Sequence, residues 1–99
     1  MYDIQVKKIY DLAPAGRQKS YYGRAKVLNT DNGAYLMSYN TIVMYISDAG
    51  DVVRLWDGWS ATTAKHIDSF CRLNNVQSIT KKEWLKMPVG LPAKITLGA

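Results

Sequence analysis

A group of cations and tyrosines near the N-terminus is the first feature of the sequence with an evident chemical use. It comprises Arg17, Lys19, Tyr21, Tyr22, Arg24 and Lys26. Cations neutralise phosphates and aromatic rings stack on unpaired bases, so this pattern is typical of single-stranded nucleic-acid binding. The candidate binding residues are therefore Arg17, Lys19, Tyr22, Arg24 and Lys26. Alternatively, one of the two tyrosines fills the core of a sheet and the charges only face solvent.

A second basic aromatic group lies farther along the chain, where Lys81, Lys82 and Lys86 surround Trp84. Lys81 and Lys82 are further candidate binding residues. The alternative is that Trp84 closes one edge of the core and the lysines are its solvated surroundings.

Catalytic and metal-binding patterns are not found in the sequence. His66 is the only histidine and Cys71 the only cysteine, so no cluster of imidazoles or thiolates has the spacing of a metal site. The two are five positions apart, which places them on different sides of a helix. We interpret Cys71 as a buried core residue and His66 as a flanking residue whose ring leans on Phe70. We expect no catalytic residues, no metal and no cofactor, and a protein that is not an enzyme.

Length and composition favour a small folded protein with an acidic partner. The chain has 99 residues, of which 47% are apolar and 11% aromatic, so we expect one domain over residues 1–99 with a packed core. The net charge of +5 and the pI near 9.4 suit an acidic partner. The single cysteine favours a reducing cytoplasm, and the lack of a long apolar run predicts no membrane insertion.

Residues 1–58 are predicted to be mainly strands, because short runs rich in Val, Ile and Tyr alternate with turn residues. In residues 21–28, alternate side chains face the core and solvent. Asn32-Gly33 is expected to supply the positive φ angles of a tight hairpin turn. Residues 35–39 and 41–46 form two strands or one bent strand, since Asn40 tolerates the left-handed region.

From Ser60 on, the apolar residues follow helical spacing instead of the alternation typical of strands. This change predicts a helix over residues 60–74, with the Ser60 hydroxyl as its N-cap. A capping box of Thr80 and Glu83 predicts a short helical turn over 80–87, and residues 88–99 form an irregular tail or an edge strand. The predicted fold class is α+β: an antiparallel meander of four or five strands, one main helix packed on one face, and a short C-terminal helical turn.

Two large rings flank the predicted junction between the last strand and the helix. Trp56 and Trp59 stand on either side of Asp57-Gly58. Such rings usually anchor a helix on a sheet, and the alternative is an exposed binding hot spot. One turn into the helix, Thr62, Thr63 and His66 are spaced to share a hydrogen-bond network that fixes this junction.

Three stretches of the chain carry a resemblance. The pattern Ser-Tyr-x-Thr-x-Val at residues 38–43, followed by Trp-x-Gly-x-Ser-x-Thr-Thr-x-x-His-Ile at 56–67, resembles short uncharacterised proteins of bacteriophages and prophages. Residues 21–25 are similar to the same group. The resemblance implies a viral accessory protein acting in the cytoplasm of a bacterial host cell, and it supplies no catalytic residues.

Two functions of different classes follow. The first is a non-enzymatic phage accessory protein that binds and blocks a host protein or ribonucleoprotein complex, such as an anti-CRISPR or another counter-defence inhibitor. The second is a single-stranded nucleic-acid binding module that uses a basic aromatic strand and loop. A homodimer is a further possibility, because Tyr35, Met37 or Met44 exposed on an edge strand would favour pairing of two copies through sheet extension.

Overall fold

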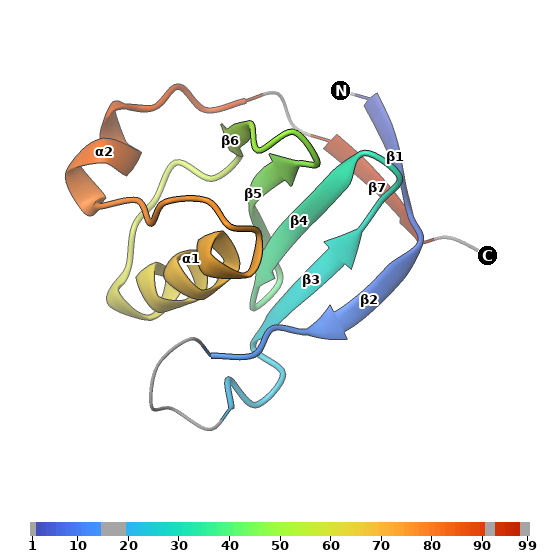
Figure 1. Cartoon of the computed structure of the whole chain (residues 1–99), viewed down its shortest axis with the longest axis horizontal. Coiled ribbons are helices and arrows are strands. Elements are labelled where there is room, and N and C mark those ends of the chain that lie inside the picture. The colour runs from blue at the N-terminus through green and yellow to red at the C-terminus, as the bar shows by residue number, and fades with distance from the viewer. Residues whose placement is uncertain (1, 15–19, 91–92, 98–99) are drawn as a thin grey trace.

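The computed structural model describes residues 2–14, 20–90 and 93–97, and its centre is a five-stranded antiparallel sheet (Figure 1). The strands lie in chain order: β2 (Lys8–Asp11), β3 (Ala25–Asn29), β4 (Gly33–Ser38), β5 (Thr41–Ser47) and β6 (Val52–Arg54). Each strand therefore pairs with its neighbour in sequence, which confirms the predicted meander. Residues 35–46 form two strands rather than one bent strand.

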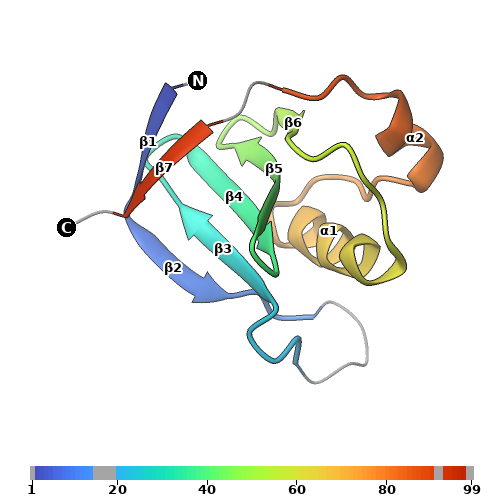
Figure 2. The same ribbon diagram turned by 180° about the vertical axis from the view of Figure 1, so that it is seen from behind.

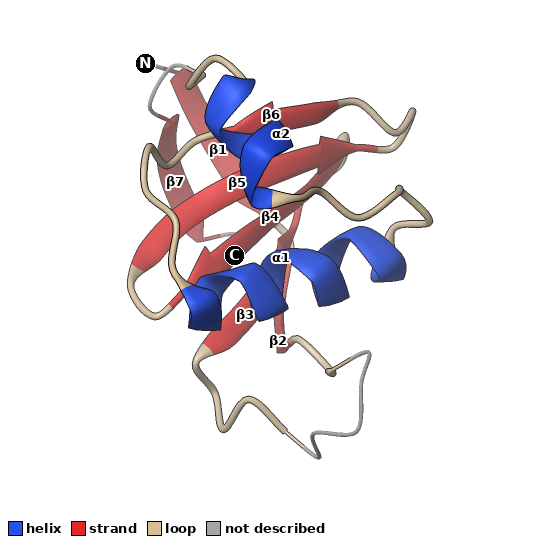
Figure 3. Ribbon diagram, turned by 90° about the vertical axis from the view of Figure 1, so that its left-hand side faces the viewer, coloured by secondary structure: helices blue, strands red, loops and turns tan. Residues whose placement is uncertain are grey.

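One helix covers one face of this sheet, and a second, shorter helix lies beside it (Figure 3). The first, α1 (Ala61–Leu73), has Ser60 as N-cap, and the second, α2 (Lys81–Lys86), begins at the predicted capping box of Thr80 and Glu83. Both helices thus begin where their capping residues predict, and the α+β fold class is confirmed. No helix among the described residues has the length and apolar character that crossing a bilayer requires.

The first and last strands form a separate two-stranded parallel sheet (Figure 2). β1 (Tyr2–Val6) runs beside β7 (Ala93–Leu97), with Tyr2 opposite Ala93. The expected edge strand near the C-terminus is therefore present, but it does not extend the main sheet. Val6, at the end of β1, packs with Leu28 and Tyr35 in a small cluster on the face of the sheet that α1 leaves uncovered.

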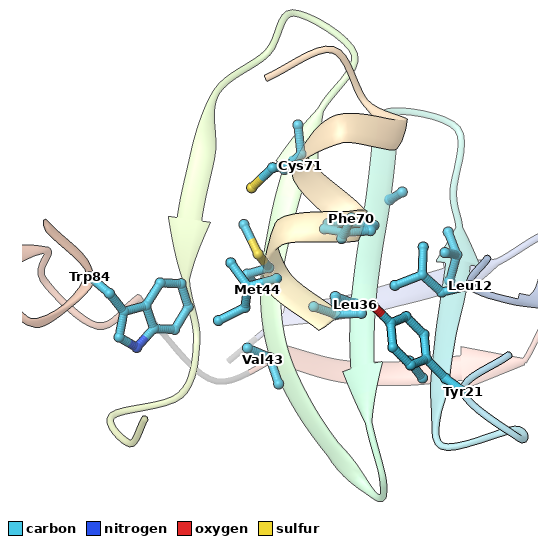
Figure 4. Packing of buried hydrophobic residues seen from close by; sticks show 13 residues of the cluster. Leu12, Tyr21, Leu36, Val43, Met44, Phe70, Cys71 and Trp84 are labelled. Carbon is cyan, nitrogen blue, oxygen red and sulfur yellow. The ribbon is translucent and has the colours of Figure 1, made fainter. Parts of the chain in front are cut away.

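The main core lies between the sheet and α1 (Figure 4). Ile67, Phe70 and Cys71 of the helix have no exposed surface and meet Val27 and Leu36 of the sheet. Burying a large apolar side chain contributes about 1.5–3 kcal/mol, so this contact is the main force that holds the helix on the sheet. Figure 4 also shows Trp84 and Tyr21 on opposite sides of α1, at the two ends of the core.

Both predicted turns differ from expectation in backbone detail. The hairpin after β3 exists, but neither Asn32 nor Gly33 has a positive φ. Gly33 is needed for a different reason, since a Cβ there would lie 2.7 Å from the Cα of Ser47 on β5. In the next hairpin, Tyr39 rather than Asn40 takes the left-handed conformation, with φ of 55°.

The strand predicted over residues 21–28 is shorter than expected. Tyr22 and Gly23 have φ of 54° and 77°, so this part of the segment is a turn and β3 begins only at Ala25. Alternating polarity does not reveal such a break, because a turn residue and a solvent-facing strand residue can both be polar or aromatic. Tyr21 is buried and Tyr22 is exposed, as one predicted alternative requires.

Candidate functional site

Two turns present exposed tyrosines side by side at one end of the sheet. Tyr22 lies in the turn before β3 and is 76% exposed, and Tyr39 lies in the turn between β4 and β5 and is 50% exposed. The backbone N–H of Tyr39 donates a 2.6 Å hydrogen bond to the carbonyl of Arg24, so the turns are joined directly. Both tyrosines adopt the left-handed conformation, which non-glycine residues seldom take.

Between the first turn and α1 lies a shallow pocket of about 210 Å³, here called the Tyr22 pocket. It is lined by Tyr21, Tyr22, Arg24, Thr62, Lys65 and His66. Arg24 and Lys65 are exposed and carry positive charge, and Thr62 adds a hydroxyl. A phosphate can take charge-assisted hydrogen bonds from such cations while a base stacks on the exposed ring of Tyr22.

Two residues that line this pocket, Tyr21 and His66, are hydrogen-bonded to other buried polar side chains. The Oγ atom of Ser38 lies 2.8 Å from Nδ1 of His66 and 3.2 Å from the hydroxyl of Thr63. The Tyr21 hydroxyl donates to the carbonyl of Lys65 at 3.1 Å and lies 2.7 Å from Oγ of Ser69. These bonds connect β4 and the turn before β3 to α1, so the position of the pocket walls is fixed by the core.

His66 belongs to this buried network. It is 1% exposed and its ring contacts that of Tyr21 edge-on, with centroids 4.5 Å apart. The expectation that His66 is a flanking residue is therefore wrong, because its Nδ1 atom finds a partner in Ser38 inside the core. Burial lowers the pKa of His66 below its ordinary value, which favours the neutral ring. The predicted network with Thr63 is confirmed, whereas Thr62 faces the pocket.

A second pocket, of about 230 Å³, lies beside the turn that carries Tyr39 and is here called the Tyr39 pocket. It is lined by Ser38, Tyr39, Thr41, Val43, Trp56, Ser60 and Thr63. The rings of Tyr39 and His66 are 6.1 Å apart between centroids. His66 lines the Tyr22 pocket, so neighbouring rings take part in the walls of the two pockets.

Of the residues predicted from the first basic group, Tyr22 and Arg24 meet in the Tyr22 pocket. Lys26 does not join them. It is paired with Met37 on β4, on the face of the sheet opposite α1, because it lies one residue from the helix-facing Val27. Arg17 and Lys19 lie outside the described residues.

The second basic group stands apart from the first. Lys81 and Lys82 are exposed on α2, whereas the turn that carries Tyr22 lies at the far side of α1 (Figures 1 and 3). Trp84, which follows them on the same helix, is fully buried and donates from Nε1 to the carbonyl of Gly58 at 2.8 Å. The alternative interpretation, in which Trp84 closes an edge of the core, is confirmed.

The two tryptophans at the strand-to-helix junction have the anchoring role. Trp56 and Trp59 are both half-buried and pack against the main core. The ring of Trp59 lies 6.3 Å from that of Trp84 between centroids. Trp56 also lines the Tyr39 pocket, so it keeps one surface accessible.

Sequence reasoning missed two residues of the site, Lys65 and Tyr39. In the sequence, Lys65 is indistinguishable from the other solvent-facing positions of the predicted helix. Its closeness to Arg24 depends on how α1 crosses the sheet. Tyr39 belonged to a predicted strand or bend. The available signal was the Tyr-Asn pair between two apolar runs, which favours a two-residue hairpin turn with an exposed side chain.

Cys71 takes no part in either pocket. It is fully buried, and burial together with the charge of Asp68 raises the pKa of its thiol to about 11. The interpretation of Cys71 as a core residue is confirmed. The described residues contain no cluster of three or more His, Cys, Asp or Glu side chains that could hold a metal ion.

The fold and site define a small α+β protein with two shallow polar and aromatic pockets at one end of its sheet. Comparison with known proteins places it in a family: residues 10–86 match the model of a family of unknown function, DUF8033. The chain belongs to this family, and the matched region includes all the residues that line both pockets. No curated protein and no solved structure matches the chain.

Proposed function

We propose that this protein is a non-enzymatic module that binds single-stranded nucleic acid at the Tyr22 pocket. The observation that carries the proposal is the meeting of Tyr22, Arg24 and Lys65 from two distant parts of the chain. An exposed ring flanked by two cations offers stacking and phosphate neutralisation together, the two contributions on which sequence-tolerant single-strand binding depends.

The electrostatics of the site agree with this function. In the part of the chain that the structure describes, neither Arg24 nor Lys65 lies in an ion pair, and no carboxylate lines the Tyr22 pocket. An incoming phosphate therefore does not have to displace an acidic partner at these cations. The lysines of α2 are separated from the turn that carries Tyr22 by α1, so we place Lys81 and Lys82 outside this interface.

Fluorescence anisotropy of a labelled single strand of about ten thymidines tests the proposal, a length within the site size of such modules. The variant carries Arg24→Glu and Lys65→Glu, and the matched control carries Lys81→Glu and Lys82→Glu, with the same change in net charge. We expect the first pair to abolish binding and the control to retain most of it. Equal losses would indicate a diffuse charge effect, and no binding by the unaltered protein would reject the function.

Salt dependence gives a second measure. The logarithm of the binding constant should fall linearly with the logarithm of salt concentration, with a slope of about −0.7 for each phosphate neutralised on a single strand. Either single variant, Arg24→Gln or Lys65→Gln, should weaken binding and make this slope shallower by about 0.7, since each removes one cation.

A second function, the blocking of a host protein or ribonucleoprotein complex by a phage accessory protein, is supported by the same surface. Exposed tyrosine beside arginine is a composition found at the energetic centres of protein interfaces. Capture from bacterial lysate with the unaltered protein, and with Tyr22→Asn as control, tests it. A partner that survives nuclease treatment and is lost with the control supports this function, whereas loss of the captured material on nuclease treatment supports the first.

A further inference from the structure

The Tyr39 pocket combines ring faces with hydroxyl groups in a small space. Its volume of about 230 Å³ is smaller than the 300–1,000 Å³ typical of drug-sized ligands, so it admits a single ring system rather than a folded segment. Tyr39 and Trp56 supply the rings, and the hydroxyls come from Ser38, Thr41, Ser60 and Thr63. Flat faces with polar edges are the shape and chemistry of an unpaired nucleobase.

The hydroxyl groups of this pocket differ in whether they are already engaged in hydrogen bonds within the protein. Ser38 and Thr63 are buried and bonded to each other, and Ser38 also contacts His66. Ser60 accepts the N–H of Thr63 at 3.1 Å, which leaves its own hydroxyl proton for another acceptor. Thr41 is exposed. Donors at Ser60 and Thr41 therefore stand at the opening, where they can meet the edge of a base.

The backbone at Tyr39 is held in a costly conformation. A non-glycine residue in the left-handed region costs of the order of 1 kcal/mol or more and persists only where its surroundings impose it. The hydrogen bond from Tyr39 to the carbonyl of Arg24 imposes it here. The result is a half-exposed ring that lines the Tyr39 pocket and lies next to His66.

Neighbouring helix residues connect the two pockets. Thr62 lines the Tyr22 pocket and the next residue, Thr63, lines the Tyr39 pocket. Both pockets therefore border the first turn of α1.

We propose that the Tyr39 pocket is a nucleobase subsite that accepts one unpaired base between Tyr39 and Trp56, while the adjoining phosphate lies at Arg24 and Lys65. The inference rests on the proposed function and specifies it. The single-stranded nucleic acid passes over the turn that carries Tyr39, with one base stacked on Tyr22 and another base in the Tyr39 pocket. Because the pocket has donors and acceptors at its edge, it can favour one base over another, which the open face of Tyr22 cannot do.

Free nucleosides test the subsite without any phosphate. We expect thymidine or adenosine, titrated to about 10 mM, to shift the amide resonances of Thr41, Ser60 and Thr63 and the indole N–H of Trp56 in a ¹H–¹⁵N spectrum, since stacking of one base gives dissociation constants of the order of millimolar. These shifts should not change between low and high salt. No saturable shift with any nucleoside, or equal shifts with glucose, would overturn the proposal.

Matched variants separate this subsite from the Tyr22 pocket. Tyr39→Asn removes the ring but suits the left-handed backbone, and Tyr39→Phe keeps the ring. We expect Tyr39→Asn to abolish the nucleoside shifts and to weaken oligonucleotide binding about tenfold, as the loss of one stacked base implies, while Tyr39→Phe changes neither by more than about twofold. Tyr22→Asn should leave the nucleoside shifts intact.

The two proposals fail in different ways. Oligonucleotide binding that needs Arg24 and Lys65 but is unchanged by Tyr39→Asn would reject the base subsite and keep the proposed function. Nucleoside shifts that Tyr39→Asn removes, in a protein that binds no oligonucleotide, would support the subsite and reject the function.

Discussion

The Oγ atom of Ser38 lies 2.8 Å from Nδ1 of His66, and this contact joins the end of β4 to the middle of α1 inside the core. Both groups are largely shielded from water, since Ser38 is 3% and His66 1% exposed. Every buried side-chain nitrogen or oxygen among the described residues has a hydrogen-bond partner. The contact therefore satisfies two groups that would otherwise oppose folding.

Replacing Ser38 by Ala should destabilise the protein by about 1–3 kcal/mol, because a buried imidazole nitrogen loses its partner. Urea unfolding followed by circular dichroism measures the change. Thr62→Ala, at an exposed position of the same helix, is the control and should change stability by less than about 0.5 kcal/mol. Equal effects of the two variants would show that the Ser38 contact does not stabilise the fold.

Stability should fall as the solution is acidified below about pH 6.5, the ordinary pKa of histidine. Burial lowers the pKa of His66 in the folded protein, so the unfolded chain binds the proton more readily in this range. The contribution of His66 to the free energy of unfolding therefore rises with pH up to about 6.5 and is level above it. Urea midpoints at pH 5.5, 6.5 and 7.5 measure this, and a higher midpoint at pH 5.5 than at 7.5 would contradict it.

The left-handed turns at Tyr22 and Tyr39 should tolerate asparagine and reject valine. Asparagine adopts positive φ with little cost, whereas a β-branched side chain clashes there. We expect Tyr22→Asn to keep the melting temperature within a few degrees and Tyr22→Val to destabilise by about 1–2 kcal/mol. Because Tyr22 is largely exposed, loss of packing contributes little to the difference. Equal melting temperatures for both variants would argue against a left-handed Tyr22.

Arg54 should be among the positions of the sheet where substitution lowers stability most. It is 5% exposed, and its guanidinium donates to the carbonyls of Trp56, Asp57 and Met87 at 2.9, 2.7 and 2.9 Å. Lysine cannot reproduce this planar set of donors, so Arg54→Lys should cost about 2–4 kcal/mol.

The matched substitution for Arg54→Lys is Arg72→Lys. Arg72 pairs with Asp68 on the exposed side of α1, a pair worth about 1 kcal/mol or less. Chemical denaturation of both variants gives the comparison. A cost at Arg54 no larger than that at Arg72 would mean that the three carbonyls find other donors.

Cys71 should react with a thiol-specific dye only when the protein unfolds. Its thiol is fully buried and its pKa is raised to about 11, so the reactive thiolate is scarce at neutral pH. The rate of modification should therefore increase with urea in parallel with the unfolded fraction. Rapid modification of the folded protein in the absence of urea would contradict the burial of this helix face.

Local signals in the sequence predicted the helices and strands well, but they did not predict which distant segments pair in the fold. Ser60 and the Thr80–Glu83 capping box fixed both helix starts, because a cap depends on residues within one turn. The turn at Tyr22 that interrupts the predicted strand was not foreseen, since alternation of polar and apolar side chains carries no information on φ. The pairing of β1 with β7 escaped too, because no local pattern encodes a partner at the other end of the chain.

The candidate site was predictable in part for the same reason. Tyr22 and Arg24 are close in sequence and stay together in the Tyr22 pocket. Lys26 is equally close in sequence, yet the pleat of β3 carries it to the opposite face. Lys65 comes from a helix forty residues later, and its place beside Arg24 follows from how α1 packs on the sheet.

The parallel pairing of β1 and β7 has a consequence for how the chain acquires its structure. Strands in the meander can pair as soon as each hairpin is made, since their contacts are local. β1 has no partner until β7 has been synthesised, so during translation it remains an unpaired strand. Closing so long a loop is entropically costly, and this small sheet should therefore assemble last and exchange its amide hydrogens first.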